Sequence, residues 1–201
     1  MAKPSSVSRR LKSCITYLQM RDYEQALIHL FPALDKTAKR RRPKQGVGDR
    51  IRNFVADEEA MITAVATRNI FQNIRVNDVS FPEAIYKFGR TAISHEGELD
   101  PRLQFNDSRS LQIGSVWNLP SSYITGLCVA VMAAPENMHE SIDAPLSLAI
   151  FDRKFQINEL WGAKSEIQGV ICKAFRNPNL FDPAQQSVAT DRREDAAPAE
   201  Q

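Results

Sequence analysis

Residues 121–134 are apolar on nearly all sides of a helix, with Ile124, Leu127, Val131 and Met132 spread around it. A helix of that kind is stable only where other elements cover its whole surface. The chain has 201 residues, of which 43% are hydrophobic and 25% charged, so it can bury one core but is too short for two full domains. We therefore expect a single domain, residues 1–176, around this central helix.

Other segments show the 3.6-residue apolar period of amphipathic helices. Residues 5–19 and the segment after Asp22 are predicted to form two antiparallel helices, the second ending before Pro43. Residues 48–71 contain one or two helices, with Asp57 as a candidate cap between them. A last helix is expected to begin at Asn158 and to end near residue 175.

The helix of residues 80–97 has clear signals at both ends. Ser80 and Glu83 have the capping-box spacing that starts a helix. Gly97 suits the left-handed conformation that often ends one. The buried side is predicted from a stripe of apolar residues: Ile85, Phe88, Ala92 and Ile93.

Two segments change to the alternating period of β-strands, residues 103–116 and residues 146–157, each with a polar turn in the middle. Residues 74–79 are short and also favour strand. The predicted fold class is mainly α, a helical bundle with two small β-hairpin insertions. Residues 177–201, rich in proline, acids, Gln and Ala, are predicted to be a disordered tail.

Composition excludes several classes of protein. The net charge of +2 is too small to indicate a polyanion partner by itself, and no phosphate-binding glycine loop or metal-ligand spacing is present, so we expect no cofactor and no metal. Cys14, Cys128 and Cys172 are odd in number and widely spaced, which indicates small core residues in a reducing compartment rather than a disulfide framework. With no signal-peptide or membrane-span pattern, a cytoplasmic protein without membrane contact is expected.

A basic block follows the second predicted helix: Lys39, Arg40, Arg41, Arg42 and Lys44. One interpretation is a solvated helix end, where cations complement the helix dipole. The other is a surface that neutralises the backbone of a nucleic acid. Asp35, just before the block, is either a buried carboxylate that orients a cation or, as we favour, a solvated acid among lysines.

Arg90 and His95 form the most informative polar pair. A guanidinium can hold phosphate oxygens while an imidazole transfers a proton near neutral pH. Because residues five apart on an α-helix differ by about 140° in direction, the pair can converge only if His95 lies in the last turn. We expect Arg90 to lie away from the apolar stripe, facing solvent or a second subunit. Alternatively, Arg90 pairs with Glu83, Glu96 or Glu98 and His95 binds the last carbonyls of its own helix.

The spacing Arg90-x4-His95 near the end of a helix resembles the R-x4-6-H motif of the HEPN superfamily. The strings 30–39 and 90–99 look like those of uncharacterised bacterial proteins that share the motif, and the resemblance covers roughly residues 5–175. It implies a bundle of four or five helices that usually dimerises and brings two Arg/His pairs into one cleft. One departure is Thr91, because active members usually have Asn, Asp or His directly after the arginine.

The resemblance implies a metal-independent endoribonuclease of a toxin or anti-phage defence type. Arg90 would hold the scissile phosphate, His95 would act as general acid or base, and Thr91 and Glu96 would support them. Lys39, Arg40, Arg41, Arg42 and Lys44 would bind RNA. The implied partners are RNA, a second copy of the chain and an antitoxin or other regulatory protein. Two alternatives stay open: a non-catalytic module that binds RNA, nucleotide or protein, and a scaffolding helical protein.

Overall fold

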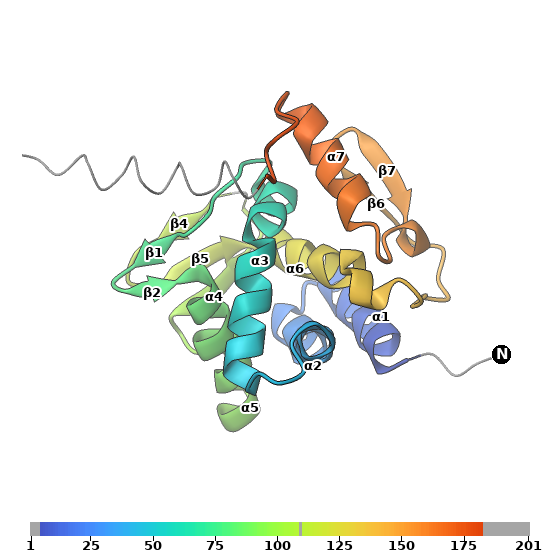
Figure 1. Ribbon diagram of the computed structural model, residues 1–201. Helices are drawn as coiled ribbons and strands as arrows, with labels where there is room; N and C mark the ends of the chain where they lie inside the picture. Colours follow the sequence, from blue (N-terminus) through green and yellow to red (C-terminus); the bar gives the residue numbers. More distant parts are fainter. Residues whose placement is uncertain (1–4, 109, 183–201) are drawn as a thin grey trace, which may run out of the picture.

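The chain begins with an antiparallel helical hairpin, seen in a computed structural model that describes residues 5–108 and 110–182 (Figure 1). Helix α1 (Ser6–Gln19) starts where the Ser5 side chain accepts hydrogen bonds from the backbone of Val7 and Ser8, and α2 (Tyr23–Arg41) starts where Asp22 accepts one from Gln25. These local caps confirm both predicted starts.

Helices α3 (Val47–Thr67) and α6 (Ser122–Ala133) cross at the centre of the molecule. All but two residues of α6 are buried, which confirms the predicted central helix. Gly126 permits the close approach, since a Cβ there would lie 2.6 Å from the carbonyl oxygen of Ile62. The expected cap at Asp57 is wrong: Asp57 lies inside the single helix α3, and its carboxylate pairs with Arg41 and Arg42 instead.

The helix that carries Arg90 and His95 has three parts: α4 (Phe81–Ala84), the π-helix η1 (Ile85–Thr91) and α5 (Ala92–Glu96). Both predicted ends are confirmed, since Ser80 accepts a hydrogen bond from the Glu83 backbone and Gly97 has a φ of 85°. A π-helical turn contains more residues than an α-helical turn, so the side chains after Ile85 are rotated relative to a regular α-helix.

In the part of the chain that the structure describes, three small sheets flank the helices. Strands β1 (Arg75–Val76) and β2 (Val79–Ser80) are antiparallel, and so are β6 (Ser147–Ile150) and β7 (Arg153–Gln156), which confirms the second predicted hairpin. In Figure 1 the first of these sheets and the three-stranded sheet lie on one side of the helical core, whereas β6, β7 and α7 (Lys164–Ala174) lie on the other.

The predicted hairpin at residues 103–116 is wrong in its pairing. Strands β3 (Leu103–Asn106), β4 (Gln112–Ile113) and β5 (Trp117–Pro120) form a sheet in the order β3-β5-β4, with β3 parallel to β5. Trp117 and Leu119 are buried, and Phe81 packs against Trp117. The strand that packs against the helical core, β5, is therefore the central one. The alternation of apolar and polar residues along the chain does not predict which strand is central.

The C-terminal region contains two short 3₁₀-helices, η2 (Pro135–Asn137) and η3 (Ile157–Glu159), before α7. The last helix therefore begins later than predicted, because Asn158 binds the backbone of Ile142 and Gly162 has a φ of 70°. Of the predicted tail, residues 183–201 lie outside the described part of the chain, while Leu180 and Phe181 pack against the core. None of the described helices is both long and apolar enough to cross a bilayer.

Candidate active site and basic surface

Arg90 lies near the end of η1 and lines a cleft of about 150 Å³ between this helix and α2. The other residues of this cleft, which we call the Arg90 cleft, are Ile28, Phe31, Pro32, Asp35, Ile93 and Ser94. We expected Arg90 to face solvent or a second subunit; instead it is half-buried in this cleft against α2. The wide turns of η1 rotate its side chain relative to a regular α-helix. Within residues 5–108 and 110–182 its guanidinium has no hydrogen-bond or ion-pair partner.

Asp35, the one acid in the Arg90 cleft, is paired with Arg50 of α3. Arg50 donates from Nε to Oδ1 at 2.7 Å and from Nη2 to Oδ2 at 3.0 Å, and the hydrogen bond to Asp35 raises the pKa of Arg50. Asp35 therefore pairs with a cation, as the first interpretation expected, but its side chain is 28% exposed rather than buried. The favoured interpretation, a solvated acid among lysines, misses this ion pair. Sequence reasoning missed Arg50, because nothing local to it indicates its partner.

His95 is exposed in the last turn of α5, as the motif requires. In the described structure the His95 side chain forms no hydrogen bond, so it does not bind the last carbonyls of its helix. The expected alternative partner of Arg90, Glu83, pairs with Arg52 instead. His95 does not line the Arg90 cleft, so one chain does not bring the two motif side chains into one cavity.

The two supporting residues differ in position. Glu96 is exposed at the end of α5, whereas the hydroxyl of Thr91 is buried and has no hydrogen-bond partner among the described residues. Thr91 does not line the Arg90 cleft. Its hydroxyl therefore does not face the space next to the arginine.

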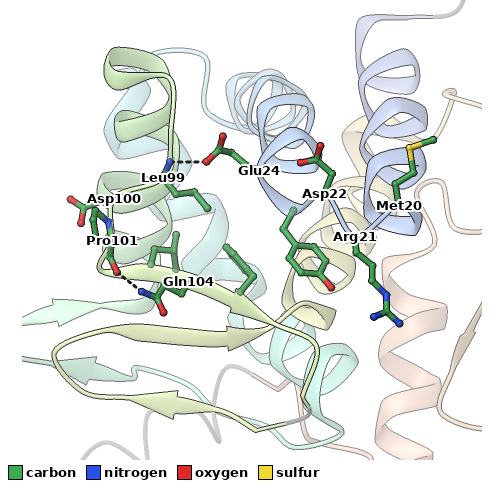
Figure 2. Close-up of a pocket in the computed structure, with 11 residues that line it drawn as sticks. Met20, Arg21, Asp22, Glu24, Leu99, Asp100, Pro101 and Gln104 are labelled. Atoms are coloured by element: carbon green, nitrogen blue, oxygen red, sulfur yellow. Dashed lines mark hydrogen bonds between the residues drawn. The ribbon is translucent and has the colours of Figure 1, made fainter.

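An open pocket of about 680 Å³ lies between the α1–α2 turn and residues 99–105 (Figure 2). In Figure 2 the carboxylate of Glu24, at the start of α2, accepts the backbone N–H of Leu99 at 3.3 Å. This bond ties the chain just after Gly97 to α2. It therefore helps to fix the end of α5, where His95 lies.

The three arginines of the basic block are paired with acids from other elements. Arg40 pairs with Glu140 at 2.9 Å, and Arg42 pairs with Asp57 at 2.7 Å. Arg41 donates to Glu58 at 2.7 Å and to Glu136 at 2.8 Å. The Glu58 side chain is 1% exposed, so the Arg41 and Lys164 cations compensate a buried charge.

Lys39 and Lys44 are exposed and, over the described ranges, form no hydrogen bond or ion pair. Lys39 follows Pro32 and Asp35 by seven and four residues, the helical spacing that puts all three on the same side of α2. Pro32 and Asp35 line the Arg90 cleft, so Lys39 extends the positive charge of that cleft along α2. Over the same ranges no three His, Cys, Asp or Glu side chains are grouped to hold a metal ion.

The fold and these sites define a mainly α-helical protein with small peripheral sheets. It belongs to the Rv1289 family, whose model matches residues 6–187. Relatives include the uncharacterized proteins Mb1320 of Mycobacterium bovis and Rv1289 of Mycobacterium tuberculosis. Each is 25% identical over 171 residues, which cover 74% of this chain and 80% of the relative. No solved structure matches the chain.

Proposed function

We propose that this protein is a metal-independent endoribonuclease with a HEPN-like helical bundle. The observation that carries the proposal is the state of Arg90: a half-buried guanidinium with no partner in the described structure, beside an acid that Arg50 already neutralises. Such a cation in a small cleft suits a phosphate, whose oxygens accept two parallel N–H bonds.

In the proposed reaction Arg90 binds the scissile phosphate and stabilises the charge that develops on its oxygens. The ribose 2′-oxygen attacks the phosphorus atom as a base removes its proton, and the 5′-oxygen leaves with a proton from an acid, which yields a cyclic phosphate. His95 performs one of these proton transfers. Lys39 and Lys44 bind the RNA backbone next to the cleft.

A second copy of the chain completes this site in our proposal. His95 lies outside the Arg90 cleft of its own chain, so a dimer in which two such helices face each other would supply the missing imidazole. A toxin or anti-phage defence role, cytoplasmic location and control by an antitoxin or other regulatory protein are part of the same proposal.

The buried hydroxyl of Thr91 favours one alternative, a non-catalytic HEPN-like module that binds RNA, nucleotide or protein. At this position a side chain that reached the substrate could assist the chemistry, whereas a buried hydroxyl cannot. Such a module would bind RNA through Arg90 without cutting it.

The test is RNA cleavage by the full chain in EDTA. Arg90→Ala and His95→Ala should each lower the rate by about 100-fold or more, because each removes a group that acts in the transition state. Arg9→Ala and His139→Ala are matched controls, since both residues are exposed; they should cleave at the wild-type rate. RNA binding without cleavage by the wild type would support the alternative, and cleavage that survives both motif substitutions would refute the proposed site.

A further inference from the structure

Two of the three cysteines are neighbours in the structure although 114 positions separate them in the sequence. Cys14 of α1 and Cys128 of α6 are both buried, and their sulfur atoms lie 3.4 Å apart in a hydrogen bond. The sequence indicated three small core residues, which is correct for Cys14 and Cys128, whereas Cys172 is only half-buried. We propose that Cys14 and Cys128 are a redox-sensitive pair that a peroxide converts into a reversible disulfide.

The pair needs little movement to react. A disulfide bond is about 2.05 Å long, so the two sulfur atoms must approach by roughly 1.3 Å, within reach of side-chain rotation and a small shift of α1 against α6. Cys172, the third cysteine, donates a weak hydrogen bond to the Pro178 carbonyl and is not part of this contact.

The two sulfur atoms differ in how accessible they are to a small oxidant. Cys128 lines an apolar cleft of about 180 Å³, together with Ile15, Leu18, Val129, Met132 and Leu148. Cys14 does not line this cleft, and it is 0% exposed. A molecule as small as hydrogen peroxide therefore reaches Cys128 first.

Cys128 therefore reacts with the peroxide, and Cys14 reacts second, with the oxidised Cys128. The chemistry of Cys14 agrees with this order. Hydrogen bonding to Cys128, together with burial, raises the pKa of the Cys14 thiol well above its usual value, which makes Cys14 a poor first nucleophile. Cys128 loses its proton and the thiolate attacks one peroxide oxygen; the O–O bond breaks to leave a sulfenic acid and hydroxide, which takes up that proton as water. The Cys14 sulfur then attacks the sulfenyl sulfur, and the sulfenic oxygen leaves as water with the Cys14 proton. The two thiols lose two electrons, and the peroxide is reduced to two molecules of water.

The experiment treats the reduced full chain with hydrogen peroxide, blocks the remaining thiols with N-ethylmaleimide and digests the protein without reductant for mass spectrometry. We expect a peptide pair linked through Cys14 and Cys128 that dithiothreitol separates. Oxidation should also raise the Tm by about 5 °C or more, since the bond closes a long loop between α1 and α6. Neither the linked peptide nor the Tm increase should be affected by Cys172→Ser.

Cys14→Ser and Cys128→Ser should each abolish the linked peptide. If either variant fails to fold, the wild-type comparison alone decides the matter, because an unchanged Tm after peroxide overturns the proposal. Links to Cys172 or between chains, or a Cys128 sulfinic acid beside an alkylated Cys14, would overturn it as well.

Discussion

Asp35 of α2 accepts two hydrogen bonds from Arg50 of α3, at 2.7 and 3.0 Å, and the same aspartate lines the cleft of Arg90. Because Asp35 is already paired with Arg50, its negative charge does not neutralise Arg90. The guanidinium of Arg90 therefore stays unpaired, and an unpaired cation is what phosphate binding needs.

Arg50→Gln should weaken RNA binding. With Arg50 neutral, Asp35 becomes available to pair with Arg90, and we expect the Kd for RNA to rise by about tenfold, the effect of one charge-assisted hydrogen bond. A filter-binding or fluorescence-anisotropy titration measures it. Adding Asp35→Asn to Arg50→Gln should restore the affinity, and a double variant as weak as the single one would contradict this account.

Lys39 and Lys44 should carry the salt dependence of RNA binding. Replacing both with Gln should flatten the slope of log K against log salt by about 0.7 per lysine for single-stranded RNA, because fewer counterions are displaced. Lys154→Gln with Lys173→Gln is a control of the same charge, on exposed residues of β7 and α7. If this control flattens the slope as much, Lys39 and Lys44 are not the residues that contact the RNA backbone.

Glu59 should make the protein less stable as the pH rises. The residue is 3% exposed, and burial raises its pKa to about 7, although the backbone N–H groups of Asn73 and Ile74 oppose the shift. The unfolded chain releases this proton near pH 4.5. Between these values the folded state binds more protons, so the free energy of unfolding falls with rising pH, by up to about 3 kcal/mol in total.

Glu59→Gln removes this titration. Denaturant unfolding at several pH values between 4.5 and 8 should show a flatter profile than the wild type. Glu98→Gln, at an exposed acid, should leave the slope unchanged. A Glu59→Gln profile parallel to that of the wild type would show that Glu59 is ionised throughout this range.

Gly126→Ala should lower the free energy of unfolding by about 1–3 kcal/mol, the usual effect of overpacking a core. The added methyl group would lie 2.6 Å from the Ile62 carbonyl oxygen and force α3 and α6 apart. Gly169→Ala is the matched control, because a Cβ at this α7 position meets nothing within 4 Å. It should stabilise the protein by up to about 1 kcal/mol through helix propensity, and equal effects of the two variants would contradict the close contact.

The sequence by itself determined the mainly helical class, the central helix and several helix ends. Ser80 caps its helix and Gly97 adopts the left-handed conformation, as predicted. Ser5 and Asp22 cap the first two helices at the starts that the sequence predicted. These features are local: a side chain bonds to backbone two or three residues away, so neighbouring residues contain the whole signal. An apolar surface all round a helix likewise requires burial, whichever elements cover it.

Only the tertiary structure decided which distant groups meet. It chose Arg50 as the partner of Asp35, placed Cys128 against Cys14 and put β5 between β3 and β4. The π-helical turns of η1, which rotate Arg90 relative to a regular α-helix, were not predicted from the sequence. Each outcome depends on how whole elements pack against one another, and that is set by the summed burial of many side chains rather than by residues adjacent in the chain.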